Sequence, residues 1–467
     1  MSLDWTKVTL GEIFRVKHGF AFKGEFFTET PQKYCLVTPG NFSIGGGFQL
    51  AKAKYYSGEV PQGYILKVGD VVVTMTDLSK QADTLGYSAI IPENNVWLHN
   101  QRIGLLEFKP NLEADPLFIS YLLRTHDYRA WIVGSATGTT VKHTSPSRIE
   151  SFECNIPPIN QQKKIAKILS DLDEKIHFNN QINHTLESIA QTIFKSWFID
   201  FDPVRAKIAA KQEGKDSELA AMCAISGKSE EELQQMSEDD FAELQATAAL
   251  FPDELVESEL GAVPRGWGVG CVGDEVSTIS KTYPLKQVEE VIFLNTGDIL
   301  EGKFLHANKS RTESLPGQAK KSIQKDDILY SEIRPQNKRF AYVHFDAEDY
   351  VVSTKLMVLR KKSTIPSHFV YFILSRQSTI DFLQVMAESR SGTFPQITFD
   401  VLSKVEYLKP NNNALIDIFT RKVLSPFFDK KVMNETENNK LIGVRDNLLP
   451  KLLSGEVDVS GLQIEVA

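Results

Sequence analysis

The sequence predicts an α+β protein in which two repeated α/β domains are separated by two long antiparallel coiled-coil helices, with a pseudo-two-fold arrangement inside one chain. Two observations predict this fold. Residues 159–198 form a long amphipathic stretch, and the pattern of the first half of the chain returns about 255 residues later. Two such copies indicate a duplication, because a solenoid needs several short repeats.

The long amphipathic stretch has a coiled-coil pattern. About 40 residues at 1.5 Å each make a rod of roughly 60 Å, which needs a partner helix. Pro157 and Pro158 precede it, and Asn160 is its expected N-cap. Asn179 interrupts the pattern and either fixes the register of the paired helices or marks where their contact loosens. The apolar positions are Ile165, Leu172, Leu186 and Ile193, with Ile168, Leu169, Ile176, Ile182, Ile189 and Trp197 beside them.

The composition is that of an ordinary soluble globular protein. The 467 residues are 42% hydrophobic and 24% charged, and the length suggests two to four domains. No apolar run approaches the ~20 residues that cross a bilayer, and the first 24 residues lack a signal-peptide core, so we expect a cytoplasmic protein. The four cysteines have no paired spacing, which argues against a disulfide framework or a structural zinc site.

The charge is unevenly distributed along the chain. The net charge is −8, but residues 200–262 hold 16 acidic and 5 basic residues, or −11, which leaves +3 for the remainder. The acidic segment has little apolar periodicity, which favours a linker or a partly ordered insert over an independent domain. The mildly basic remainder is compatible with a nucleic-acid partner.

The order of segments is domain, helix, domain, helix. Trp5 and the Leu-Gly-Glu at 10–12 return as Trp267 and the Val-Gly-Asp at 272–274, and residues 415–453 repeat the long helix. The two helices should pack antiparallel and bury both apolar stripes, with one domain at each end. The expected boundaries are 1–158 and 263–410 for the domains, 159–199 and 411–454 for the helices, 200–262 for the acidic insert and 455–467 for the tail.

The first domain shows alternating strands and one helix. Strand-like segments occupy residues 71–75, 87–91 and 102–108, separated by turn residues. A helix should begin at Asp115-Pro116 and end before Gly134.

No catalytic or metal-binding motif is recognisable. A DNA methyltransferase needs a Gly-rich cofactor loop and an Asn/Asp-Pro-Pro-aromatic motif, but residues 155–158, Asn-Ile-Pro-Pro, have an extra residue and no aromatic after them. Residues 227–229, Gly-Lys-Ser, lack the upstream glycine of a phosphate-binding loop, and the nine histidines lack paired ligand spacing. We therefore expect a non-catalytic chain without a metal site.

Polar and basic residues gather in loops at matched positions of the two copies. Arg, Lys, Asn and Gln have the donor and acceptor geometry that matches purine edges in the DNA major groove. Each residue alone is explained as part of a solvated turn, but the recurrence in both copies favours DNA binding, through base or phosphate contacts. The candidates are Lys17, Phe20, Lys23, Thr74, Thr76, Lys80, Gln81, Thr139, Lys142 and His143 in the first copy, and Arg334, Gln336, Asn337, Lys338, Arg339, Arg390, Thr393 and Gln396 in the second.

These features together resemble the specificity (S) subunits of type I restriction-modification systems. Residues 19–23, 196–204, 250–253 and 258–267 are similar to segments of that family. The second helix departs from the family's helix signature, because its Gln and first Ile have no clear counterpart around residues 414–421. The signature Pro-x-x-x-Gln-x-x-Ile-x-x-x-Leu-x-x-x-Asp-x-x-Ile matches Pro158, Gln162, Ile165, Leu169, Asp173 and Ile176.

The resemblance implies that each domain is a target recognition domain for half of a bipartite, asymmetric sequence in double-stranded DNA. It implies that the helices set the spacing of the halves and dock two modification (M) subunits, for which Lys163, Lys167 and Glu174 are a candidate surface. Restriction (R) subunits join through the assembled complex. S-adenosylmethionine, ATP and magnesium are expected on the partner subunits, with no cofactor in this chain and no membrane contact.

Two other functions are compatible with the residues alone. A stand-alone DNA-binding or scaffold protein would lack a neighbouring M gene and would not co-purify with an M subunit. An enzyme with an unrecognised site would methylate or cleave DNA without a partner.

Overall fold

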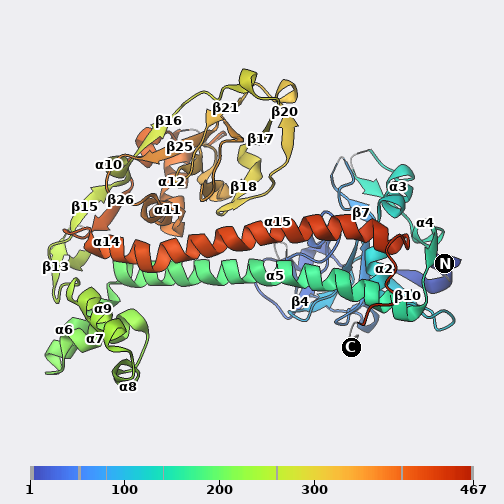
Figure 1. Ribbon diagram of the computed structural model, residues 1–467, viewed down its shortest axis with the longest axis horizontal. Coiled ribbons are helices and arrows are strands. Elements are labelled where there is room, and N and C mark those ends of the chain that lie inside the picture. The colour runs from blue at the N-terminus through green and yellow to red at the C-terminus, as the bar shows by residue number, and fades with distance from the viewer. Residues whose placement is uncertain are drawn as a thin grey trace. The chain divides into compact units, whose positions relative to one another are not determined.

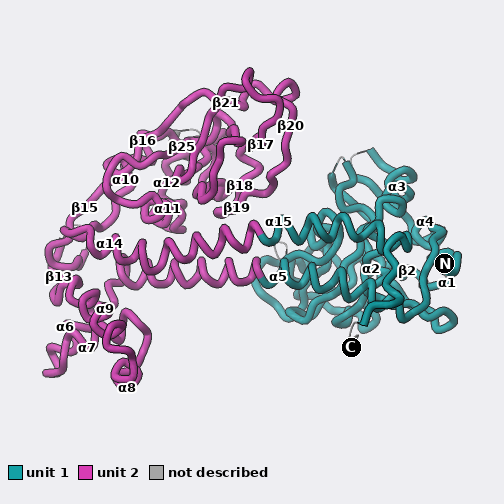
Figure 2. The backbone as a smooth tube through the Cα atoms, viewed as in Figure 1, with its two compact units in different colours: residues 1–178, 437–467 teal, residues 179–436 magenta. Residues whose placement is uncertain are grey.

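The computed structural model describes residues 5–50, 54–79, 81–139, 141–258, 261–390 and 393–463. The chain divides into two compact units, residues 1–178 with 437–467 and residues 179–436 (Figure 2). Each unit contains one globular domain and part of each long helix (Figure 1). Across the described ranges, no helix is both long enough and apolar enough to traverse a lipid bilayer.

The first unit contains two four-stranded sheets and a terminal strand pair. The main sheet is antiparallel and packs its buried residues against the helices that follow it. The main sheet has the order β2 (Phe14–His18), β10 (Ile103–Phe108), β6 (Val71–Thr74) and β8 (Ser88–Ile90). The second sheet has the order β3 (Phe27–Thr28), β5 (Tyr55–Tyr56), β4 (Tyr34–Leu36) and β9 (Val96–Leu98), and the terminal pair is β1 (Thr6–Thr9) with β12 (Glu153–Ile156).

The second unit repeats the main sheet and the terminal strand pair, whereas its second sheet has the parallel pair at the centre and not at the edge. In both units the second sheet contains one parallel pair, β4 with β9 and β17 with β24. The predicted duplication is therefore confirmed. The main sheet has the order β16 (Val276–Ile279), β25 (Leu356–Lys361), β22 (Ile328–Ser331) and β23 (Phe340–Tyr342). The second sheet has the order β20 (Lys309–Arg311), β17 (Glu290–Leu294), β24 (Tyr350–Ser353) and β21 (Ala319–Ser322), and the terminal pair is β15 (Gly268–Cys271) with β26 (Glu406–Lys409).

The helix expected between Asp115 and Gly134 is two helices, α2 (Pro116–Leu122) and α3 (His126–Gly134). Asp115 caps α2 as predicted, because its carboxylate accepts a hydrogen bond from the Phe118 amide at 2.8 Å. The break lets both helices bury their own aromatic residues, such as Phe118 and Tyr128, in one core. In the second unit, α11 (Ser367–Ser375) and α12 (Gln377–Arg390) show the same break.

The long helices follow the prediction with two adjustments. Helix α5 runs over Ile159–Lys195, so it begins before Asn160, which is not its N-cap. The second helix consists of α14 (Ala414–Phe419), a π-helical turn at Thr420–Leu424 and α15 (Ser425–Leu453). In each unit the two helices run side by side in opposite directions (Figure 1). Lys175 forms an ion pair with Glu437 at 3.3 Å in the first unit. In the second unit the ring centroids of Phe194 and Phe419 lie 5.8 Å apart.

Asn179 contributes to the helix pairing in the second unit. The Asn434 amide donates to the Asn183 side-chain oxygen at 2.7 Å and lies 3.5 Å from the Asn179 carbonyl oxygen. Asn179 and Asn434 are each only 1% exposed. A buried polar contact of this kind favours one helix register over its neighbours. Here the side-chain contact is formed by Asn183 and Asn434, and Asn179 takes part through its backbone carbonyl.

The π-helical turn shifts the alignment of the two long helices by one residue. Fully buried Phe419 lies 254 positions after buried Ile165, whereas buried Asn434 lies 255 positions after Asn179. The turn at Thr420–Leu424 adds one residue between these positions. Before the turn, matching residues of the two repeats lie 254 positions apart, and after it they lie 255 positions apart.

Gln162 has a structural role that its counterpart lacks. Its side chain accepts a hydrogen bond from the Asp115 amide at 2.9 Å and donates to the Pro157 carbonyl at 2.8 Å, while 1% exposed. This contact joins the start of α5 to the start of α2. The residue 254 positions later is Ile416, which is fully buried and packs without a polar group.

The acidic insert differs from the expected linker or partly ordered segment, because the structure forms helices there. The last three of these helices have acidic or hydroxyl N-caps, and Ser229 forms a capping box with Glu232. The helices are α6 (Asp202–Gln212), α7 (Ser217–Ser226), α8 (Glu230–Gln234) and α9 (Glu238–Ala249). Their small core is formed by Ala221, Met222, Leu233 and Ala248.

A charged network joins α5, α2 and α15 in the first unit. The Asp173 carboxylate accepts hydrogen bonds from Tyr121 at 2.8 Å, Arg124 at 3.0 Å and Arg445 at 2.8 Å. Burial alone would raise the pKa of Asp173, but the two guanidinium groups and the phenol lower it below its usual value. Asp173 therefore stabilises the folded unit in its ionised form.

We expect Asp173→Ala to lower the free energy of unfolding by about 3 kcal/mol, because two partly buried guanidinium groups lose their acceptor. A lowered folded-state pKa gives a contribution that is complete above about pH 5 and is lost as the pH falls below about 4. Denaturant titrations at several pH values measure the difference. Asp446→Ala is the control, because its carboxylate is 59% exposed and contacts only the neighbouring Arg445 among the described residues. A constant difference from pH 7 to pH 3 would contradict this role for Asp173.

Candidate nucleic-acid interface

Two of the predicted groups in the first unit leave the main sheet at the same end. The strand register pairs His18 with Gly104 and Thr74 with Ile103. The last residues of β2 and β6 therefore lie beside the first residues of β10. Lys17 at the end of β2 and the loop after β6 extend from this common end of the sheet.

A third predicted group joins the loop after β6 through a short strand pair. Strand β11 (Lys142–His143) pairs with β7 (Thr76–Asp77), and His143 lies opposite Thr76. The Thr76 hydroxyl is 3.1 Å from His143 Nδ1. Residues more than 60 positions apart in the sequence are thus brought together, with Thr139 exposed in the preceding turn.

Asp77 holds the loop that presents Gln81. Its buried carboxylate accepts hydrogen bonds from the Ser79 amide at 2.6 Å, the Thr84 amide at 2.5 Å and the Thr84 hydroxyl at 2.7 Å. Burial would raise the pKa of Asp77, but these donors lower it below its usual value. Gln81 is exposed in this loop, and Lys80 lies outside the described residues.

Two predicted contact residues in this loop are corrected by their burial. Thr74 is 0% exposed, and its hydroxyl donates to the Thr76 carbonyl at 2.9 Å. Thr76 is 5% exposed. A strand-end threonine and a loop threonine look alike in sequence, but here both side chains stabilise the turn and neither presents a surface to DNA.

The group around Phe20 combines charge with an aromatic cluster. Phe20 is partly exposed and contacts the rings of Phe22 and Tyr64 at 5.1 and 5.2 Å. The Lys17 ammonium lies 5.3 Å from the Tyr64 ring centroid and donates to the Gly63 carbonyl at 3.0 Å. Lys23 is exposed, 3.9 Å from Glu25.

The second unit repeats the loop pairing. Ile333, two residues after β22, forms a bridge with Gln396, and the Arg334 amide donates to the Pro395 carbonyl at 3.1 Å. Strand β22 pairs with β25 through Ser331 and Leu356, so this loop also leaves the main sheet at the end shared with β16. The turn after the domain helices thus meets the loop after a central strand in both units.

The loop of the second unit contains three exposed polar residues. Arg334, Gln336 and Asn337 are exposed, and they lie at or in a short 3₁₀ turn, Pro335–Asn337. The Gln336 backbone N–H donates to the Gln384 side-chain oxygen of α12 at 3.2 Å, which ties the turn to a helix. Arg334 adopts a φ of 41°, a left-handed conformation that is uncommon for arginine and occurs often at functional sites.

The remaining residues of this loop are engaged in the protein. Arg339 donates to the Gly297 and Ile299 carbonyls at 3.0 and 2.9 Å, and Lys338 pairs with Glu301 at 2.6 Å. Arg339 therefore stabilises the loop in this structure. Thr393 is exposed, whereas Arg390 ends α12 and its side chain is not among those described.

Sequence reasoning did not identify Lys355 as part of this region. Its ammonium lies 3.4 Å from the Gln396 side-chain oxygen and 3.5 Å from Glu332. Lys355 follows β24 in a tight turn, and only the pairing of distant strands brings it beside the loop. No pattern in the sequence distinguishes it from other surface lysines.

Comparisons with known proteins agree on one family. The family described as Type I restriction modification DNA specificity domain matches residues 2–188 and 264–440. The chain is 34% identical over 409 residues to the type I restriction enzyme HindI specificity subunit of Haemophilus influenzae, covering 81% of this chain and 87% of that protein. It is 22% identical over 386 residues to the MjaIX specificity subunit of Methanocaldococcus jannaschii, covering 81% and 76%. The crystal structure of a type I system S subunit from M. genitalium has a similar fold, with a TM-score of 0.51, 16% identity and 98% of each chain covered.

We expect Asp77→Ala to lower the free energy of unfolding by about 2 kcal/mol, because three hydrogen-bond donors lose a charged acceptor. Protease nicking within residues 77–84 should also become faster, since the loop loses its anchor. Denaturant titration and mass spectrometry of the fragments measure both effects. Asp83→Ala serves for comparison, because no described residue bonds to its carboxylate, and it should change stability by less than about 0.5 kcal/mol. Equal effects of the two variants would show that Asp77 does not organise the loop.

Proposed function

The chain belongs to the family of type I restriction-modification DNA specificity subunits, and from this premise we propose that it selects the DNA sequence on which such a complex acts. Each α/β domain recognises one half of a bipartite target in double-stranded DNA. The observation that carries the proposal is the loop pairing found in both units, where β11 meets β7 and Gln396 meets Ile333. Because the same pair of loops occurs in both units, each unit can contact one half-site.

The side chains on the two loops support an asymmetric target. The first unit exposes Gln81 and His143, whereas the second exposes Arg334, Gln336 and Asn337. Arginine forms a bidentate contact with guanine, and glutamine or asparagine with adenine. Because the backbone plan is shared and the side chains differ, the two domains recognise different base sequences.

The long helices provide surfaces for the two M subunits. Ile182 and Ile189 in the second unit are 40% and 49% exposed, although the heptad pattern predicts them to be in the stripe beside the helix seam. Apolar residues left exposed along a helix are suited to a protein partner. Lys163 and Glu174 are also exposed on α5, and Lys167 pairs with Asp171.

The chemistry of the complex belongs to its partner subunits in this proposal. S-adenosylmethionine is held by the M subunits, and ATP and magnesium act with the R subunits. This chain contributes specificity and a scaffold, without catalysis of its own. Incubating the purified chain with DNA and each cofactor tests this division, and any methylation or cleavage without partners would contradict it.

A footprint of the complex with M subunits on its methylated target tests the bipartite arrangement. We expect two protected segments with an unprotected centre, since each domain contacts one half-site. The target itself is found by single-molecule methylome sequencing of the host. One continuous protected segment would contradict recognition by two separate domains.

We expect Arg334→Ala to weaken binding to the target by about 1–3 kcal/mol and to relax selectivity at one base pair of the half-site bound by the second domain. The reason is the loss of one bidentate base contact at an exposed loop. Equilibrium binding to a set of single-base target variants measures both effects. Arg311→Ala is the matched control, because Arg311 is an exposed arginine of the same unit on a different sheet. An equal loss of affinity for all sequences would instead assign Arg334 to a phosphate contact.

A further inference from the structure

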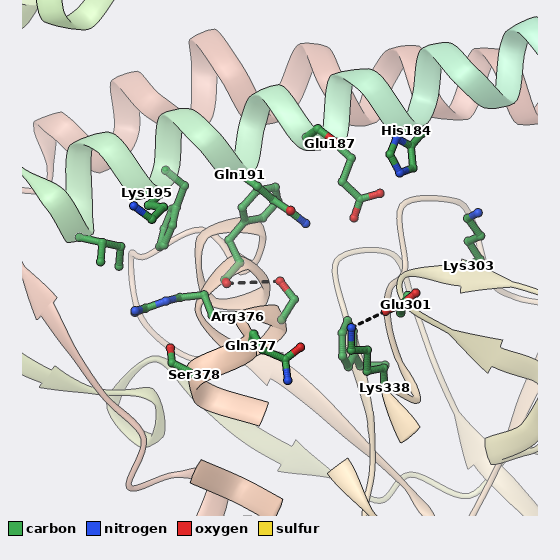
Figure 3. A pocket seen from close by; sticks show the side chains of 16 residues that line it. His184, Glu187, Gln191, Lys195, Glu301, Lys303, Lys338, Arg376, Gln377 and Ser378 are labelled. Carbon is green, nitrogen blue, oxygen red and sulfur yellow. Dashed lines mark hydrogen bonds and ion pairs between the residues drawn. The ribbon is translucent and has the colours of Figure 1, made fainter. Parts of the chain in front are cut away.

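The second unit contains a cavity that the proposed function does not use. Its volume is about 560 Å³, and it lies between α5, the junction of α11 and α12, and two loops of the domain (Figure 3). Its apolar wall consists of Phe194, Phe340 and Phe372, which are all buried. The remaining lining is polar and charged, so the cavity is suited to a ligand with an apolar part and a charged group.

The two ends of the cavity differ in charge. Figure 3 shows Arg376 and Lys195 at one end with Ser378 nearby, and Glu187, His184 and Lys303 at the other. At the second end, acidic groups lie among the basic ones. Lys338 pairs with Glu301 at 2.6 Å, and the positive charges of Lys431 and Lys303 act on Glu187, whose pKa burial raises above its usual value.

Among the described residues, the Arg376 side chain has no hydrogen-bond or ion-pair partner at this cavity. Its side chain is half-buried, and within the described part of the chain no atom accepts a hydrogen bond from its guanidinium or forms an ion pair with it within 4 Å. Burial lowers the pKa of Arg376 below its usual value, against a favourable attraction from Asp200. Asp200 itself is bound by Lys195. The guanidinium nitrogens are not fully buried, so a ligand can reach them and supply the acceptor.

We propose that this cavity binds a phosphate group, with Arg376 as its principal ligand and Lys195, whose ammonium is paired with Asp200, as a further donor. The planar guanidinium matches two phosphate oxygens at once, and the neutral donors Gln191, Gln377 and Ser378 line the same region. The phosphate comes either from a free phosphate-bearing molecule or from the DNA backbone. The second source rests on the proposed function, because Lys338 joins the cavity to the loop of Arg334.

Titration of the full-length chain with inorganic phosphate at constant ionic strength tests the site. We expect saturable heat of binding in calorimetry and a rise in the melting temperature, since a ligand that binds only the folded state stabilises it. Arg376→Gln should raise the phosphate Kd at least tenfold and remove the rise in melting temperature. Without phosphate, its melting temperature should equal or exceed that of the wild type, because a half-buried charge is gone.

Two further variants separate a ligand contact from a general effect. Lys195→Gln should weaken phosphate binding less than Arg376→Gln does, and it provides a second measure of the site if Arg376→Gln fails to fold. Arg421→Gln is the matched control, because Arg421 is 65% exposed, pairs with Glu243 at 3.6 Å and does not line the cavity. Arg421→Gln should bind phosphate as the wild type does. Phosphate affinity that is equal in all variants would overturn the proposal.

The source of the phosphate is found from the salt dependence of DNA binding by the complex with M subunits. The slope of log K against log salt is negative. If its magnitude is smaller by about one in Arg376→Gln, a backbone phosphate is assigned to the cavity. Lost phosphate binding with an unchanged slope assigns a free ligand. An unchanged slope without any phosphate binding overturns the proposal. Failure of the wild-type complex to bind DNA concerns the proposed function alone, because the inorganic phosphate titration needs no DNA.

Discussion

The structure depends on the pairing of α5 with the helix formed by α14 and α15. A long amphipathic helix gains most of its stability from burying its apolar face, so neither helix is expected to persist alone in water. Polar contacts add specificity to this pairing in each unit, through Asp173 and Arg445 in the first and through Asn434 in the second. The same helices carry the domains, because Gln162 fixes α2 to α5 and Phe194 packs against Phe369 of α11.

The duplication separates the scaffold from the surface that varies. Both units share the strand order of the main sheet, the break between the two domain helices and the meeting of two distant loops beside the main sheet. The positions that hold this scaffold are buried, such as Asp77, or tied to backbone carbonyls, such as Arg339. The exposed positions do not hold the scaffold together, so their side chains can change without changing the fold. This division suits the proposed recognition of two different half-sites.

The sequence predicted the elements with strong periodicity and could not predict features that depend on tertiary contacts. The heptads, the strands near residues 71–108 and the Asp115 cap are local patterns, and each was confirmed to within a few residues. The burial of Thr74 depends on strand pairing, and the position of Arg376 in a cavity beside α5 depends on tertiary packing, so neither has a local pattern. The acidic insert differs from the expectation for another reason: its serine helix caps are local signals, but its low hydrophobicity predicts a linker.

The first unit is discontinuous in the chain, and this affects the order in which the protein folds during synthesis. Leu452, Leu453 and Val459 belong to the same core as Leu10 and Ile165. The second unit is a single uninterrupted segment, residues 179–436, and all of its core residues leave the ribosome before the first unit can be completed. The N-terminal domain is synthesised first, but the C-terminal residues that complete its core are synthesised last. Part of its apolar surface therefore stays uncovered during synthesis. Such a chain has most reason to need a chaperone at its N-terminal domain.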